Sequence, residues 1–360
     1  MVTLQPKNIS KYLKRLRLQI DQRISRYLPR RINKEWAKEF FGKGDYSLRA
    51  IQKTVLDPIW NFLDRGGKRW RPALFLLILE ALGKDPKKFF DFATIPEILH
   101  EGTLVIDDIQ DQGELRRGKP CLHKIFGVDI ALNAGNFLYF FPIYIFKKNK
   151  KKLEKEVYLR ALETYLEEMK NLHLGQGTDI FWHKGKQKEI SEKEYFQMCA
   201  FKTGCMARLA AKLAGILAKK DQKIVEEIGN FAQNIGIAFQ IQDDILDIEL
   251  TGKEREKFGK SFGNDIKEGK RSLMVIYALK KASKKDRERL IRILDKKGKT
   301  KKEILEAISI LKKCGSIEYA KEKAREIVRE SWEKVDKIFL KGKPKERLKE
   351  LIEFLIERKL

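Results

Sequence analysis

The sequence predicts an all-α protein made of one domain. Only 9 prolines and 24 glycines interrupt 360 residues, and the apolar residues between them recur at intervals of three and four rather than two. With 42% apolar residues the chain can bury a large core. No repeat of fixed period and no linker rich in serine, glycine or proline divides it. We therefore expect a single-domain helical bundle with no strand of useful length.

The predicted helices follow this periodicity along the chain. Residues 75–79 and 137–146 are apolar nearly all round, which is typical of helices enclosed by other helices. The expected helices are residues 72–82, 92–108, 129–147, 153–174, 192–217, 222–248, 271–281, 286–294, 302–313, 316–340 and 345–359.

The charge of the chain is strongly positive, with 77 Lys and Arg against 51 Asp and Glu and a net charge of +26. The basic residues gather in short runs between predicted helices, as solvent-exposed turns do, and form no recognised aromatic and basic module for nucleic acid. We therefore expect a densely charged surface and no nucleic-acid partner. The high Lys and Glu content is equally typical of a surface that supports thermal stability.

The cysteines and the N-terminus bear on the compartment. Cys121, Cys199, Cys205 and Cys314 form no CxxC pair and lie in apolar stretches, which favours reduced, buried cysteines over a disulfide or zinc framework. Charged residues interrupt every apolar run near the N-terminus, so we expect neither a signal peptide nor a transmembrane segment. The expected location is the cytoplasm. Residues 1–45 are expected to form an N-terminal helical extension, whose role the sequence does not indicate.

Two acidic clusters each end an apolar helix. In ILHEGTLVIDDIQD, Asp107 and Asp111 are four residues apart and share a helix face, with Asp108 between them. One such cluster could be ordinary surface charge, but FQIQDDILD repeats the arrangement. Carboxylates crowded in apolar surroundings take up protons or bind metal, and oxygen ligands select hard cations such as Mg²⁺. The second cluster consists of Asp243, Asp244 and Asp247.

Cationic residues lie close to the first cluster in the sequence. Magnesium held by few carboxylates completes its coordination with water and substrate phosphate, so separate groups are needed to bind the phosphates. GGKRWRP at 66–72 supplies Lys68, Arg69 and Arg71, and ELRRGKP supplies Arg116 and Arg117. Either segment alone could be a capping loop with solvated charges. Together they favour a phosphate-binding site.

These segments resemble the motifs of the trans-isoprenyl diphosphate synthases, the head-to-tail prenyltransferases that make prenyl diphosphates. The resemblance rests on GGKRWRP, DDIQDQGELRRGKP, FKTG at 201–204, FQIQDDILD and FGKSFGNDIKEGKRS at 258–272, and it extends over about residues 50–360. It implies the isoprenoid synthase fold, a helical bundle around a central cavity, and makes 46–360 the prenyltransferase domain. It also implies a homodimer with the helix of residues 129–147 partly at the interface.

The resemblance assigns residues to a metal centre and to two diphosphate subsites. Three Mg²⁺ ions are expected on Asp107, Asp111 and Asp243, with Asp247 and the middle aspartates in support. The subsite for isopentenyl diphosphate is expected to contain Lys68, Arg71, His100 and Arg117. The allylic diphosphate is expected to bind Arg116, Lys202, Lys260 and Lys270. Catalytic roles beside the cation are expected for Lys202, Thr203 and Gln240, with Asp179 of GQGTD nearby.

The implied reaction joins isopentenyl diphosphate to an allylic diphosphate, with geranylgeranyl diphosphate as the expected product. Thr103 and Gly102, one turn before the first cluster, are not bulky, so the pocket is expected to be deep. The aromatic residues of the 129–147 helix are expected either to pack in the core or at the dimer interface, or to supply one side chain that forms the floor of that pocket. These residues are Phe137, Tyr139, Phe140 and Phe141.

Four alternatives remain open at this point. A longer product is the second choice and farnesyl diphosphate the third. A terpene cyclase would be expected to lack the isopentenyl diphosphate subsite, and a non-catalytic partner subunit to have lost an aspartate or an arginine. The sequence carries all of these residues, which favours the synthase.

Overall fold

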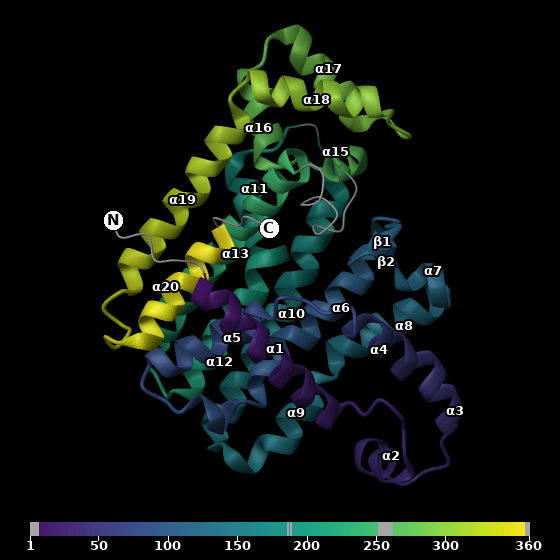
Figure 1. Cartoon of the computed structure of the whole chain (residues 1–360), viewed down its shortest axis with the longest axis vertical. Coiled ribbons are helices and arrows are strands. Elements are labelled where there is room, and N and C mark those ends of the chain that lie inside the picture. Colours follow the sequence, from purple (N-terminus) through teal and green to yellow (C-terminus); the bar gives the residue numbers. More distant parts are fainter. Residues whose placement is uncertain (1–6, 186, 188, 251–261, 357–360) are drawn as a thin grey trace. The chain divides into compact units, whose positions relative to one another are not determined.

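The computed structural model describes residues 7–185, 187, 189–250 and 262–356 (Figure 1). These residues are almost wholly helical, which confirms the predicted all-α fold. They fold into two compact units. Unit 1 comprises Met1–Tyr165, Leu209–Val225 and Phe339–Leu351, and unit 2 comprises Leu166–Arg208, Glu226–Ile338 and Ile352–Leu360. The single-domain arrangement and the boundary at residue 45 stay predictions.

Unit 1 contains the N-terminal helices and one small hairpin (Figure 1). The strands of the hairpin pair antiparallel, Leu115 with Pro120 and Arg116 with Lys119. In chain order the elements are α1 (Lys7–Tyr27), α2 (Lys34–Phe41), α3 (Leu48–Ile51), the π-helical turn η1 (Gln52–Leu56), α4 (Asp57–Leu63), α5 (Trp70–Ala81), the short turns η2 (Pro86–Phe89) and η3 (Phe92–Thr94), α6 (Ile95–Gln110), β1 (Leu115–Arg116), β2 (Lys119–Pro120), α7 (Leu122–Phe126), α8 (Val128–Phe140), α9 (Pro142–Asn149) and η4 (Lys150–Lys152).

Unit 2 contains the remaining helices. Four helices have residues in both units, namely α10 (Lys155–His183), α12 (Cys205–Leu217), α13 (Gln222–Glu249) and α20 (Lys343–Ile356). The other elements are α11 (Glu192–Cys199), the π-helical turn η5 (Ala200–Gly204), α15 (Asn264–Glu268), α16 (Leu273–Lys281), α17 (Lys284–Asp295), α18 (Lys301–Lys313) and α19 (Ser316–Val335). Helices α17 and α18 lie side by side (Figure 1).

Two predicted helices are interrupted in the structure, each at a local feature of the chain. The helix predicted over 129–147 is two helices, α8 and α9, because Pro142 lacks the N–H that would continue the first. The helix predicted over 192–217 contains the turn η5 at FKTG. The hairpin, only two residues per strand, was not predicted. Its turn contains Arg117 and Gly118, with φ of 53° and 74°.

Helix α1 is part of the core of unit 1. Its buried residues Ile9, Leu13, Leu16, Ile20 and Ile24 recur every three or four positions and form one apolar face. This face packs against α5 and η3. Helix α1 is therefore packed into unit 1, while the extent and role of an N-terminal extension stay predictions.

Small residues bring α6 close to α8. A Cβ atom on Gly102 would lie 3.0 Å from the Gly135 carbonyl oxygen, and one on Gly135 would lie 2.7 Å from Ile106. Gly102 therefore allows the close packing of α6 against α8.

The aromatic residues of the predicted 129–147 helix differ in their burial. Tyr139 and Phe141 are buried, and Phe137 is half-buried beside Phe40 of α2. Phe140 is 68% exposed.

Among the described residues, one stretch is long and apolar enough to cross a membrane by composition, namely Val128–Lys152. In the most apolar 18-residue part of this stretch, 44% is buried inside the protein. The stretch is also interrupted at Pro142. A core helix of a globular protein has the same composition, so this stretch is weak support for a membrane span.

None of the four cysteines forms a disulfide in the structure. Cys121, Cys199 and Cys205 are buried, as predicted, whereas Cys314 is partly exposed. Burial raises the pKa of Cys121 to about 12 and that of Cys199 well above its ordinary value, and Asp108 and Asp244, respectively, add to these shifts. Both thiols are therefore protonated at neutral pH and poor nucleophiles.

Helix α10 continues through two glycines, and the first of them touches the η5 backbone. A Cβ atom on Gly175 would lie 2.3 Å from the Lys202 backbone nitrogen, whereas one on Gly177 would meet nothing within 4 Å. We expect Gly175→Ala to destabilise the protein by about 2 kcal/mol or more, because the Lys202 backbone would have to move. Gly177→Ala is the matched control and should stabilise it by about 0.5 kcal/mol. Denaturant unfolding of both variants measures the difference, and equal effects would contradict the close contact.

Candidate active site

The first acidic cluster closes α6 in unit 1. Asp108 is buried, and its Oδ1 accepts a hydrogen bond from Arg116 Nε at 2.7 Å. Asp107 and Asp111 are partly exposed, and Asp107 Oδ2 lies 3.6 Å from Arg116 Nη2. The middle aspartate therefore fixes Arg116, and the other two present carboxylates on one helix face.

The hairpin sends its two arginines to different partners. Arg116 bonds the acidic cluster, whereas Arg117 donates to both carboxylate oxygens of Glu101 at 3.0 Å. Arg117 also donates to the carbonyl of Gly66, in the GGKRWRP loop. The adjacent residues Arg116 and Arg117 therefore lie at two separate positions. Two diphosphate subsites would need such a separation.

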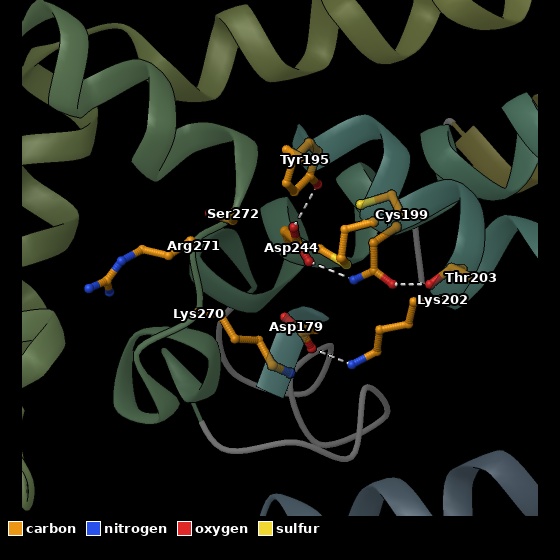
Figure 2. A pocket seen from close by; sticks show the side chains of 11 residues that line it. Asp179, Tyr195, Cys199, Lys202, Thr203, Asp244, Lys270, Arg271 and Ser272 are labelled. Carbon is orange, nitrogen blue, oxygen red and sulfur yellow. Dashed lines mark hydrogen bonds and ion pairs between the residues drawn. The ribbon is translucent and has the colours of Figure 1, made fainter. Parts of the chain in front are cut away.

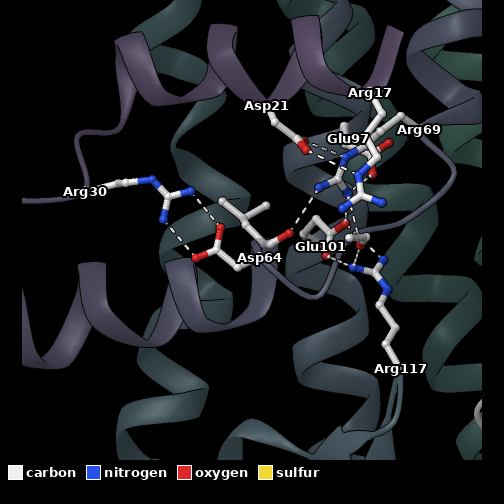
Figure 3. Close-up of polar contacts among 10 residues, drawn as sticks. Arg17, Asp21, Arg30, Asp64, Arg69, Glu97, Glu101 and Arg117 are labelled. Atoms are coloured by element: carbon white, nitrogen blue, oxygen red, sulfur yellow. Dashed lines mark hydrogen bonds and ion pairs between the residues drawn. The ribbon is translucent and has the colours of Figure 1, made fainter. Parts of the chain in front are cut away.

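The GGKRWRP segment contains Arg69, which the sequence grouped with the phosphate-binding cations and which the structure places elsewhere. The Arg69 side chain is fully buried and bonds Asp21, Glu97 and Glu101 (Figure 3). Arg71 is also mostly buried, with its guanidinium 4.4 Å from the centre of the Trp70 ring. Arg69 therefore supports the loop instead of facing a ligand.

His100 lies on α6, about two helical turns before Asp107. Burial lowers its pKa well below the ordinary value, and the nearby guanidinium groups of Arg71 and Arg117 lower it further. The imidazole is therefore neutral near pH 7. It offers a diphosphate a neutral N–H donor among cationic groups.

The second acidic cluster, in unit 2, is divided between surface and interior. Asp243 is partly exposed, whereas Asp244 and Asp247 are buried. The carboxylate of Asp247 accepts the backbone N–H of Asn264 at 3.2 Å and of Asp265 at 3.0 Å, at the start of α15. Asp247 therefore fixes the start of α15. Its role in metal binding stays a prediction.

A pocket in unit 2 brings together the FKTG motif and the second cluster (Figure 2). Thr203 Oγ1 donates to Gln240 Oε1 at 2.8 Å, and Gln240 Nε2 donates to Asp244 at 2.8 Å. The Tyr195 hydroxyl reaches the other oxygen of Asp244 at 3.2 Å. Burial, reinforced by the Asp265 carboxylate, raises the pKa of Asp244 well above its ordinary value. Thr203 and Gln240 are thus joined by a hydrogen bond, and their catalytic roles stay predictions.

The lysines of this pocket have acidic partners. Lys202 forms an ion pair with Asp179, which gives Asp179 a supporting place beside the site (Figure 2). Lys270 lies 2.8 Å from Glu268 and 3.3 Å from Asp265. Lys260 lies outside the described residues.

The carboxylates of the first acidic cluster fit a hard cation such as Mg²⁺ if substrate oxygens complete its coordination shell. Within the described ranges no three or more His, Cys, Asp or Glu residues gather closely enough to hold a metal alone. Mg²⁺ needs only one or two carboxylates when water and substrate phosphates fill the rest of its octahedron. The buried Asp108 Oδ2 accepts no hydrogen bond from the residues that the structure describes, so the first cluster contains a desolvated oxygen acceptor. Asp107 and Asp111 supply the partly exposed carboxylates.

Sequence inspection missed two groups near these motifs. Glu101 bonds both Arg69 and Arg117, and Tyr195 bonds Asp244. Glu97 and Glu101 are four residues apart in an apolar helix, and this pattern alone could have marked them as buried partners of cations. Nothing in the local sequence marks Tyr195.

The comparisons with known proteins agree on one family. A model of the polyprenyl synthetase family matches residues 52–311. A short chain isoprenyl diphosphate synthase of Methanothermobacter thermautotrophicus is 34% identical over 306 residues, which are 85% of this chain and 91% of that protein. A geranylgeranyl pyrophosphate synthase of Geoglobus acetivorans is 35% identical over 299 residues, 83% of this chain and 89% of that protein.

A solved structure gives the same result over nearly the whole chain. The geranylgeranyl pyrophosphate synthetase of Pyrococcus horikoshii matches with a TM-score of 0.84 and 31% identity, over 98% of this chain and 99% of that one. The sequence and structural matches together confirm the resemblance predicted from the motifs. This chain belongs to the polyprenyl synthetase family, whose members are prenyl diphosphate synthases.

Proposed function

We propose that this enzyme condenses isopentenyl diphosphate with an allylic diphosphate and that its main product is geranylgeranyl diphosphate. The observation that carries the proposal is the separation of Arg116 from Arg117. One bonds the acidic cluster of α6, and the other bonds Glu101 and the GGKRWRP loop. A terpene cyclase, which binds one diphosphate, has no need of the second position.

The proposed roles follow from charge and position. Bound Mg²⁺ would stabilise the departing allylic diphosphate as a Lewis acid, with three ions held by Asp107, Asp111 and Asp243 and supported by Asp247. Arg116, Lys202, Lys260 and Lys270 would bind the same diphosphate. Lys68, Arg71, His100 and Arg117 would hold isopentenyl diphosphate.

The residues beside the leaving diphosphate would shape the carbocation's surroundings. Thr203 and Gln240 are fixed to each other and to Asp244, so their oxygen dipoles are held in place before reaction. The double bond of isopentenyl diphosphate then attacks the allylic carbon, and the new cation loses a proton, for which the released diphosphate is the proposed acceptor. Incubation with Mg²⁺, isopentenyl diphosphate and each allylic primer in turn tests the proposal. Absence of a longer product with every primer would refute it.

The proposed product length depends on α6. Thr103 is one turn before Asp107, about 6 Å along the helix, and Leu99 is about 12 Å away. The Thr103 side chain is half-buried and its hydroxyl bonds the His100 carbonyl at 2.7 Å. A tail that grows along α6 away from the aspartates would pass this small side chain.

Thr103→Phe is expected to shorten the main product by at least one isoprene unit, because the ring would occupy the space of later units. Thr103→Val has nearly the volume of threonine and should leave the length unchanged, which separates bulk from loss of the hydroxyl. Chromatography of dephosphorylated products measures both. An unchanged distribution in Thr103→Phe would show that the tail does not pass this residue.

We also propose a cytoplasmic homodimer. Three apolar side chains of α8 and α9 support a dimer surface there: Leu132 is 42% exposed, Phe140 68% and Ile143 43%. Burying such side chains against a second copy removes apolar area from water. Phe140→Asp should lower the molar mass seen by light scattering if α8 is at the interface.

A further inference from the structure

A buried ionic chain in unit 1 runs from the N-terminal helix to Arg117 (Figure 3). At its centre, Arg69 donates from Nε to Asp21 of α1 at 2.9 Å and from Nη1 to Glu97 of α6 at 2.7 Å. Its Nη1 also bonds Glu101, and its Nη2 donates to the Leu63 carbonyl at 3.3 Å. A fully buried guanidinium is costly unless carboxylates and carbonyls surround it, as they do here.

Glu101 joins Arg69 to Arg117. The Glu101 side chain is 0% exposed, and its two oxygens accept Nη1 and Nη2 of Arg117, each at 3.0 Å. The paired bonds fix the plane of the Arg117 guanidinium. The same guanidinium donates to the Gly66 carbonyl and lies 5.4 Å from the centre of the Phe62 ring.

Arg117 is held but still reachable. Its side chain is 20% exposed, whereas those of Arg69 and Glu101 are 0% exposed. The backbone of both arginines is left-handed, with φ of 51° at Arg69 and 53° at Arg117. Such a backbone is unfavourable for arginine and persists only where the surrounding contacts fix it. The ionic chain supplies contacts of this kind on both residues.

We infer that Glu101 and Asp21 are positioning residues that orient Arg117 and the loop of residues 66–69 for the diphosphate of isopentenyl diphosphate. This inference rests on the proposed function, in which Arg117 and Lys68 bind that diphosphate. It also gives α1 a role, because this helix completes the support of the subsite through Asp21. Neither Glu101 nor Asp21 touches the substrate.

The main test is Glu101→Gln, which keeps the side-chain size and removes the charge. Hydrogen bonds to charged groups contribute enough that we expect KM for isopentenyl diphosphate to rise about tenfold. The KM for the allylic substrate and kcat should each stay within about twofold, since the acidic clusters are not touched. Asp21→Asn, one ion pair further from Arg117, should raise the same KM about threefold.

Asp64→Asn is the matched control. Asp64 forms a two-bond ion pair with Arg30, which, like Asp21, lies in the N-terminal segment. Both side chains of this pair are about half exposed. Exposed pairs contribute little, so all kinetic constants should be unchanged. Steady-state kinetics of the full-length protein, with thermal unfolding of each variant, provides the comparison.

A double mutant separates positioning from a purely structural role. In an Arg117→Ala background, Glu101→Gln should add less than about twofold to KM for isopentenyl diphosphate, because Glu101 acts through Arg117. Independent, multiplying effects would overturn the inference, as would an unchanged KM in the single variant. If Glu101→Gln does not fold, an unchanged KM in Asp21→Asn overturns it. A wild-type protein without condensation activity would instead refute the proposed function, and the inference with it.

Discussion

Replacing Asp107 or Asp243 by alanine is expected to lower kcat by about three orders of magnitude. Each carboxylate is proposed to hold Mg²⁺ against the departing diphosphate, and loss of several kcal/mol of charge stabilisation corresponds to a factor of this size. Both side chains are partly exposed, so the helices should keep their fold. Asp111→Ala should behave in the same way.

The measurement is turnover at saturating substrates over a range of Mg²⁺ concentrations, with circular dichroism as the test of folding. Asp45→Ala is the control, because Asp45 is an exposed aspartate outside the helices. It should retain full activity. Near-normal turnover in Asp243→Ala would remove the second cluster from the metal centre and leave the proposed mechanism without support there.

Arg117→Ala and Arg116→Ala are expected to affect different substrates. Loss of a bidentate guanidinium contact removes two charge-assisted hydrogen bonds, so Arg117→Ala should raise KM for isopentenyl diphosphate by about 100-fold. Arg116→Ala should raise KM for the allylic diphosphate more than that for isopentenyl diphosphate. It should also lower the stability, because it leaves the buried Asp108 without its cation.

His100→Ala extends the comparison to a neutral donor. Its effect should fall on isopentenyl diphosphate, as for Arg117→Ala, but be smaller, about tenfold, since its imidazole is neutral. Varying one substrate at saturating concentrations of the other gives the constants separately. Equal effects of all three substitutions on both substrates would contradict two distinct subsites.

The sequence was most informative where local geometry decides. The four-residue spacing of Asp107 and Asp111 fixes a shared helix face in any α-helix, so this pair could be predicted without a structure. The break at Pro142 was equally local and could have been predicted from the missing N–H. The sequence segments also carried the family resemblance, which the comparisons confirmed.

The burial and pairing of individual charged side chains depended on residues far away in the sequence. In GGKRWRP, Arg69 looks like a phosphate-binding cation, yet its side chain is fully buried and bonds Glu101, 32 residues further on. Asp243 and Asp247 look alike in FQIQDDILD, but the Asp247 carboxylate bonds backbone N–H groups 17 and 18 residues away. Sequence spacing cannot distinguish such residues, because burial and pairing depend on the elements that pack around them.

The sequence by itself determined the helical class, the two acidic clusters and the family, since each follows from periodicity or from residues within one or two turns. Only the tertiary structure decided which charges face outward. It placed Asp21 of the N-terminal helix on Arg69, and Glu101 between Arg69 and Arg117. The physical reason is that a buried charge is stable only beside a counter-charge, and packing of segments far apart in the chain supplies that partner.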